Sequence, residues 1–332
     1  ALAVSVGVAG GARGSRVVLF TDGLANTGVG KIRAGESSPF YLDLAQAASE
    51  LGVSVSVLTL EGENCSMENL GTTADITGGQ VDIADASAMT ESVASILKLA
   101  PVATAVECTF VLPRGLRVQH DWAAHARTMK ACYGVATRAT DVTVRFACDA
   151  ELIDEVRKQS EQQEEEQAWD LLDEAGGAPA ADKKRALHLQ AQLRYTSSTG
   201  KAMLTVIEAS LELTSSRDHA EEALNSTVAA LSAIHRAAQL AQQGLYHEAR
   251  LTLISTQRLL QRAMRTAAHQ RDYLSFVVQA EKLDQFMREV QQQEAVFGSK
   301  GGGGRHQQRD DEAAKAIFQM KAVSSAAFHA RH

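Results

Sequence analysis

The first hundred residues alternate two hydrophobic patterns. The run Val17-Val18-Leu19-Phe20 has no polar interruption, which predicts a strand buried on both faces within a parallel sheet. Later segments switch between helical spacing and alternating valines, with glycines such as Gly52 at the ends. The predicted elements are strands at 16–20, 53–60 and 80–83, and helices at 40–51, at 66–73 and from Asp85 to about Leu99. This alternation predicts an α/β fold with a doubly wound parallel sheet over residues 1–100.

After Pro101 the pattern changes to a period of two. Apolar residues alternate with others over 102–112 and 142–148, and two further segments, 188–195 and 202–213, flank a turn at Ser197-Ser198-Thr199-Gly200. Strands of this kind joined by turns predict an antiparallel β-sandwich over residues 101–215. The stretch 151–185 interrupts it, and we interpret this stretch as a solvated helical or disordered insertion, because it carries the acidic run 161–167.

From Arg217 the period becomes 3.6, which predicts an α-helical bundle over residues 216–297. Asp218 and Glu221 have the spacing of a capping box at the start of the first helix, and Gly244 ends it. Two more helices are predicted at about 246–268 and 271–296, with connections short enough for antiparallel neighbours. Four consecutive glycines mark a linker at 298–311, and a C-terminal helix is predicted over 312–332.

Composition narrows the classes of partner. The 332 residues carry a formal net charge of −7, and the basic residues are dispersed. This argues against nucleic acid or an anionic membrane as the main partner. No apolar run approaches the roughly 18 residues of a membrane span, and no signal peptide is visible. Because the chain starts at Ala1 in what resembles the end of a helix, we expect that an N-terminal part is missing.

The sequence offers no recognisable catalytic or zinc motif. The four cysteines, Cys65, Cys108, Cys132 and Cys148, form no C-x-x-C pair, so we expect free thiols in a reducing compartment. His120 and His125 have no acid or cysteine at ligand spacing, and Thr77-Gly78-Gly79 lacks the lysine of a phosphate loop. Neither G-x-S-x-G nor H-E-x-x-H is present. We therefore expect that the protein is not an enzyme.

The segment 16–23, R-V-V-L-F-T-D-G, resembles the fourth strand of a von Willebrand factor A domain. The resemblance implies that Asp22 contributes to a metal-dependent adhesion site, with magnesium as the candidate ion; Thr21 and Asn26 are its neighbours there. The alternative for Asp22 is a D-G turn that ends the strand. Asp85-Ala86-Ser87 comes near the D-x-S-x-S motif of such sites, but it lies at the wrong end of the domain, so a helix-capping role is favoured.

A longer set of motifs resembles the trunk of the COPII inner-coat subunits, over roughly residues 1–265. The matching motifs are Phe40-Tyr41-x-x-Leu44-Ala45, G-V-S-V-S-V-L, Cys65-Ser66-Met67-x-x-Leu70, T-G-G and L-R-Y-T-S-S-T-G-K. The resemblance implies an A-domain, then a β-sandwich completed by a late hairpin, then a helical domain. The family's zinc finger and gelsolin-like tail are absent from the sequence. A-domain proteins of ubiquitin ligases are also similar, especially over 217–264, but their RING module is absent.

These resemblances imply a non-enzymatic protein–protein interaction scaffold inside a larger assembly, coat-like or cytoskeletal. Its expected location is cytoplasmic and its expected partners are other proteins. Arg258, Arg262 and Arg265 are candidates for contact with an acidic partner, although exposed arginines are common on helices. The alternative is a metal-dependent adhesion or substrate-binding module of the ubiquitin-ligase type, in which magnesium links Asp22 to a partner carboxylate.

Overall fold

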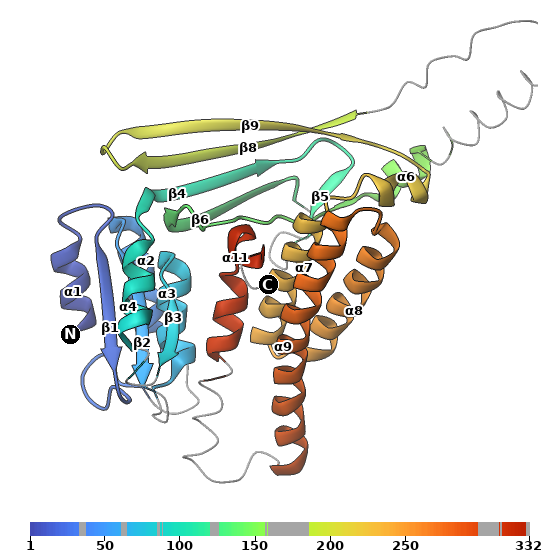
Figure 1. Cartoon of the computed structure of the whole chain (residues 1–332). Helices are drawn as coiled ribbons and strands as arrows, with labels where there is room; N and C mark the ends of the chain where they lie inside the picture. The colour runs from blue at the N-terminus through green and yellow to red at the C-terminus, as the bar shows by residue number, and fades with distance from the viewer. Residues whose placement is uncertain are drawn as a thin grey trace, which may run out of the picture.

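The computed structural model describes residues 1–32, 38–60, 65–84, 87, 89–119, 126–156, 158, 186–297, 312 and 314–329. Figure 1 shows an α/β part, long antiparallel strands that run across it, and a helical bundle beside it. Asp85, the two histidines at 120 and 125, the acidic run 161–167 and the linker 298–311 lie outside the described residues.

The α/β part is built on a three-stranded parallel sheet. Its elements are α1 (Leu2–Ala9), β1 (Arg16–Thr21), α2 (Pro39–Leu51), β2 (Ser54–Leu60), α3 (Met67–Thr77), β3 (Val81–Ala84) and α4 (Met89–Lys98). The strands pair in the order β1-β2-β3. Val55 and Val57 pack toward α1, α2 and α3, whereas Ser54 and Ser56 face a space lined by α4. The predicted parallel α/β arrangement is therefore confirmed, with helices on both faces of the sheet.

The burial predicted for the first strand is found on the second instead. β1 lies at the edge of the described sheet, and its Phe20 is 53% exposed. β2 lies between β1 and β3, and all of its residues except Leu60 are buried. The prediction that β1 is buried on both faces is therefore wrong. An apolar run identifies a strand but cannot show which position in the sheet the strand takes.

The antiparallel part has one large and one small sheet. Its strands are β4 (Pro101–Val111), β5 (Leu116–Val118), β6 (Thr128–Thr137), β7 (Phe146–Cys148), β8 (Ala186–Ser197) and β9 (Ala202–Glu212). The order is β6-β4-β8-β9 in the four-stranded sheet, and β5 pairs with β7. Leu116, Met129 and Leu187 share a core with Leu152 of a helix at 150–156.

Several sequence predictions for this part need correction. The β8–β9 hairpin is confirmed, but β5 and β6 were not predicted. Of the predicted strand at 142–148, only β7 forms. The first residues of the predicted insertion form a helix at 150–156 that is mostly exposed, but its Leu152 is buried. The remainder of that insertion is almost wholly outside the described residues.

The helical bundle begins with a break that the sequence prediction did not contain. Its helices are α6 (Arg217–Glu222), α7 (Ser226–Gln242), α8 (Tyr246–Ala263) and α9 (Ala267–Phe297). The first predicted helix is thus two helices, and Asn225 caps the second by accepting a hydrogen bond from the Val228 backbone N–H. The predicted capping box is wrong as well. Ser216 caps α6, and Glu221 instead forms ion pairs with Arg217 and Arg262.

The segment 314–329 packs between the α/β part and the bundle (Figure 1). It forms two helices, one over residues 314–321 and α11 (Ser325–His329), where one was predicted. Phe318 joins the core of the α/β part, whereas Ile317, Met320 and Phe328 join the core of the bundle. The segment therefore connects the two cores. Among the described residues, no helix has the length and apolar character needed to cross a membrane.

Candidate functional site

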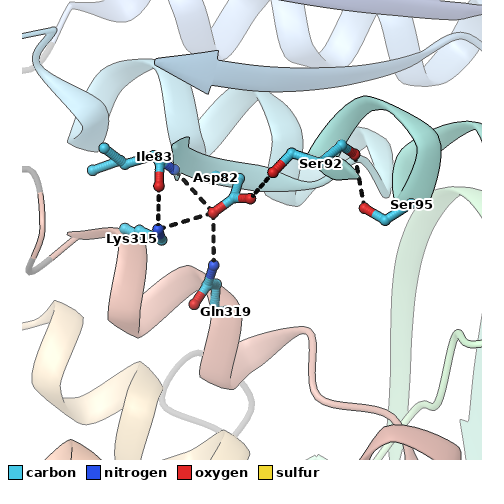
Figure 2. Close-up of polar contacts among 6 residues, drawn as sticks. All are labelled: Asp82, Ile83, Ser92, Ser95, Lys315 and Gln319. Atoms are coloured by element: carbon cyan, nitrogen blue, oxygen red, sulfur yellow. Dashed lines mark hydrogen bonds and ion pairs between the residues drawn. The ribbon is translucent and has the colours of Figure 1, made fainter. Parts of the chain in front are cut away.

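Asp82 of β3 is the centre of the polar cluster that attaches the segment 314–329 to the parallel sheet. Figure 2 shows its carboxylate between α4 and the helix at 314–321. One oxygen, Oδ1, lies 2.9 Å from Lys315 Nζ and accepts hydrogen bonds from Gln319 Nε2 and the Ile83 backbone N–H. The other oxygen accepts a 2.6 Å hydrogen bond from Ser92 Oγ. Asp82 thus joins three elements through its side chain.

Lys315 also covers the edge of the sheet. Its Nζ donates a 2.6 Å hydrogen bond to the Ile83 carbonyl, and β3 is the last strand on that side of the described sheet. An uncovered strand edge presents unpaired backbone groups, and a covering helix removes that hazard. Lys315 and Ile83 are 232 positions apart in the chain.

A glycine in α3 makes room for the same segment. A Cβ atom on Gly71 would lie 2.2 Å from the Phe318 ring, far closer than real contacts allow. Phe318 itself is only 5% exposed. Gly71 is therefore required by close packing and not by its backbone conformation, because the residue lies inside a helix.

The other end of the segment is held by α3 and by the bundle. Lys321 pairs with Asp75 of α3, and the carbonyl of Val323 accepts a 2.8 Å hydrogen bond from His235 Nε2 on α7. Because a carbonyl can only accept, Nε2 carries the proton, and the Thr143 hydroxyl then donates to Nδ1 at 3.2 Å. Burial lowers the pKa of His235, although the bond to Val323 and the charge of Asp141 oppose that shift.

A cavity of about 650 Å³ lies where these parts meet. Strands β1 and β2, helix α4, strand β6, the bundle helices α7 and α9, and the segment 314–329 all contribute to its lining. Cavities of this size, situated between structural units, are common small-molecule sites. The cavity and the Asp82 cluster together form the candidate functional site.

The residues proposed from sequence lie elsewhere. Asp22 is exposed at the carboxyl end of β1, as the strand pattern predicts, and the neighbouring Thr21 hydroxyl donates to the Gly23 carbonyl at 2.9 Å. Within the described part of the chain, no group of three or more histidine, cysteine, aspartate or glutamate residues is placed to hold a metal ion. Magnesium binding by Asp22 therefore stays a prediction.

The cysteines are free thiols, two of them buried. Burial raises the pKa of Cys108 to about 11, which disfavours the reactive thiolate. Arg262, one of the three arginines considered for an acidic partner, is engaged with Glu221 of the same chain at 2.8 Å.

The residues that form the Asp82 cluster carry little signal in the sequence. Asp82 gave one local signal, since an aspartate inside the short apolar strand V-D-I-A calls for a polar partner. Nothing local identifies Lys315 or Gln319 as that partner, because both lie more than 230 residues away. His235 lies on the buried face of a helix whose pattern shows only a core stripe.

Comparison with known proteins supports the fold. No protein family model matches the sequence. The protein "Circularly permutated Ras protein 1" of Dictyostelium discoideum is 22% identical over 288 residues, which are 86% of this chain and 31% of that protein. The crystal structure of the human COPII-coat protein Sec24c matches with a TM-score of 0.56 and 15% identity, over 93% of this chain and 40% of that one.

The match to the coat protein confirms a fold like that of a coat subunit over most of the chain. At 15% identity it shows the fold alone. The chain spans under a third of the Dictyostelium protein and two fifths of the coat protein. Function therefore has to be argued from this chain's own surfaces and sites.

Proposed function

We propose that this chain is a non-enzymatic protein-interaction scaffold within a larger, coat-like intracellular assembly. Its likeness to a COPII-coat protein supports that proposal at the level of fold. We further propose that residues 1–100 are an A-domain-like part of the scaffold. Three parallel strands with helices on both faces, and Asp22 at the carboxyl end of β1, support this assignment.

The observation that carries the proposal is strand β9. Every residue of it except Leu211 is exposed. Successive residues point to opposite faces, so Leu204 and Val206 lie on one face, Met203 and Ile207 on the other, and these four are 44–57% exposed. Within the described chain, β8 is the strand that pairs with β9, and the opposite edge of β9 has no partner strand.

The occupant that fits such an edge is an extended segment of a partner protein. Added as a further strand, it satisfies the backbone groups along β9 and covers apolar side chains on both faces. A helix or a flat surface would leave the backbone groups of the edge unpaired. Strand addition therefore accounts for both features together.

The test is to identify the proteins that bind the whole chain and to compare two matched variants. Ile207→Lys places a charge on β9, and Leu251→Lys places one on α8, at side chains that are 50% and 51% exposed. We expect partners to be lost with Ile207→Lys and retained with Leu251→Lys. Equal binding by both variants would contradict the assignment of β9. Self-association through β9, visible as a dimer in the absence of other proteins, would replace the partner by a second copy.

If the scaffold proposal is right, partner binding does not require a metal ion. If binding depends on β9, Asp22→Ala and a chelator should both leave it unchanged. Loss of binding under either condition would favour the metal-dependent alternative, because a magnesium ion needs its carboxylate ligand.

A further inference from the structure

Three polar groups that line the cavity have at most one hydrogen-bond partner among the described residues. Within the described residues, the Arg16 guanidinium makes one hydrogen bond, from Nη1 to the Ile96 carbonyl at 2.6 Å, and it forms no ion pair. Ser54, only 5% exposed, has no hydrogen bond to its hydroxyl in the same part of the chain. Gln279, 2% exposed, has an unpartnered amide oxygen. Of these three groups, the Gln279 oxygen is a buried atom without a partner in the described part of the chain, a condition that is rare in folded proteins.

Two of these groups are neighbours by register. Arg16 of β1 pairs with Ser54 of β2 in the parallel sheet, so both side chains lie on the face that lines the cavity. Ser56, two residues further on, accepts a hydrogen bond from the Gln80 backbone N–H at 3.1 Å. The polar end of the cavity therefore combines one cation with a free hydroxyl on a regular strand surface.

The carboxylates near the cavity do not neutralise Arg16. Asp82 pairs with Lys315, and Asp75 pairs with Lys321. Asp141 accepts a hydrogen bond from the Ser325 backbone N–H. Burial lowers the pKa of Arg16, and no carboxylate contributes to that shift. A partly buried guanidinium without a counter-charge is a ready binding group for an anion.

The β6 wall of the cavity adds a further donor. Tyr133 lines it, and burial, more than the charges of Cys108 and Cys132, raises the pKa of its phenol to about 12. The phenol therefore stays protonated and able to donate. The Tyr133 backbone lies close to Gly78, because a Cβ on Gly78 would meet the Tyr133 carbonyl at 3.3 Å.

We propose that this cavity binds a small molecule through an oxyanion group, a phosphate or a carboxylate, held by Arg16 and Ser54. The volume of about 650 Å³ has room for more than the anionic group. The rest of the ligand extends toward α9, where Gln279 lines the cavity. Because three parts of the chain line the cavity, the ligand stabilises their mutual placement. The proposal is independent of the scaffold proposal, since β9 does not line the cavity.

The test is calorimetric titration of the whole 332-residue chain with three probes: inorganic phosphate, phenyl phosphate and benzoate. Phenyl phosphate and benzoate share the ring and differ in the anion, so they distinguish a phosphate ligand from a carboxylate ligand. We expect at least one probe to bind saturably with one site per chain. Arg16→Gln should weaken that binding at least about tenfold, the range of one charged hydrogen bond, and Ser54→Ala should weaken it less.

Arg13→Gln is the matched control. Arg13 lies three positions earlier and also donates to a backbone carbonyl, that of Glu50, but it does not line the cavity. Its loss should leave binding unchanged. Ser54→Ala tests the site even if Arg16→Gln fails to fold. Two results would overturn the proposal: no saturable binding of any probe up to about 10 mM, tenfold above a Kd of about 1 mM, or unchanged affinity in both cavity variants.

Discussion

In the described part of the chain, the strands β3 and β9 lie at the edges of their sheets, but the edge of β3 is covered and the edge of β9 is open. The edge of β3 is covered by a helix from the far end of the chain, through Lys315 and the seated Phe318 ring. Within the described residues nothing covers β9, although it is longer and carries apolar side chains on both faces. Strand edges are normally protected. The β3 edge therefore serves stability within the chain, and the open β9 edge is where the proposed partner segment would add.

Removing the Phe318 ring should have the largest effect on the covered edge. Phe318→Ala deletes a nearly buried aromatic side chain from the α/β core, and such deletions cost about 3–5 kcal/mol. We expect hydrogen exchange of the β3 and α3 amides to accelerate accordingly, while β9 exchange stays the same. Leu251→Ala, at a side chain that is 51% exposed, is the control. Equal acceleration in β3 and β9 would show that the two edges open together and are not stabilised independently.

The Phe318 ring packs directly against Gly71, and we call this position the Phe318 seat. Adding one methyl group there should have the next largest effect on stability. Alanine favours a helix over glycine by about 1 kcal/mol, yet Gly71→Ala should destabilise by about 1–3 kcal/mol, because its Cβ would lie 2.2 Å from the Phe318 ring. The matched control is Gly7→Ala in α1, where nothing lies within 4 Å of the new Cβ. Thermal unfolding of both variants checks the prediction. Stabilisation by Gly71→Ala would mean that Phe318 does not occupy this seat.

Neutralising Asp82 should weaken the attachment of the helix at 314–321 to β3 without abolishing it. Asp82→Asn leaves Lys315 without its counter-charge and replaces an acceptor of four hydrogen bonds or ion pairs with an amide. The pair is partly exposed, with side chains 25% and 30% accessible. We therefore expect the free energy of unfolding to fall by about 1–2 kcal/mol. Chemical denaturation at low and high salt measures it. Lys130→Met, which breaks a more exposed pair with Glu107, should cost less than about 0.5 kcal/mol.

The two edges also differ in how far the sequence predicts them. The β8–β9 hairpin follows from two alternating segments and a Ser-Ser-Thr-Gly turn, all local signals. The cover of β3 depends on contacts between residues more than 230 positions apart, which no local pattern encodes. Periodicity likewise gave three helices of the bundle but not the break at Asn225, because the apolar stripe continues through it.

The same limit applies to the candidate site. Arg16 and Ser54 belong to strands that the pattern predicts, but their position beside a cavity depends on packing among three parts of the chain. Asp22 was found because it belongs to a contiguous motif. Sequence reasoning therefore locates motifs better than it locates sites assembled from distant segments.

The bundle end of the segment 314–329 should respond to pH. The pKa of His235 is lowered by burial, so below its ordinary value of 6.5 the unfolded chain binds more protons than the folded one. Stability should therefore fall as the pH drops through about 6.5, with a slope of at most about 1.4 kcal/mol per pH unit for one proton. Asp141 and Lys321 face the ring with opposite charges, and their effects oppose each other.

His235→Gln separates this effect from other titrations. Glutamine can still donate to the Val323 carbonyl but does not titrate, so the variant should lose the decline in stability below pH 6.5. His247→Gln changes an exposed histidine of α8 and serves as the control. Denaturation midpoints between pH 5 and pH 8, spanning the ordinary range of histidine, measure the difference. A decline that persists in His235→Gln would assign it to another group.

The smallest effect is expected where the open edge is tested for stability alone. Val206→Ala on β9 removes methyl groups from a side chain that is 47% exposed, so unfolding should change by no more than about 0.5 kcal/mol. Val81→Ala on β3 makes the same change at a side chain that is 8% exposed, beside the Phe318 seat. It should cost about 2 kcal/mol, from two lost methyl groups and the space they leave. Thermal unfolding of the two variants compares one substitution on two edge strands. Equal losses of stability in the two variants would mean that β9 is covered in the isolated chain. The proposal that β9 binds a partner would then be wrong.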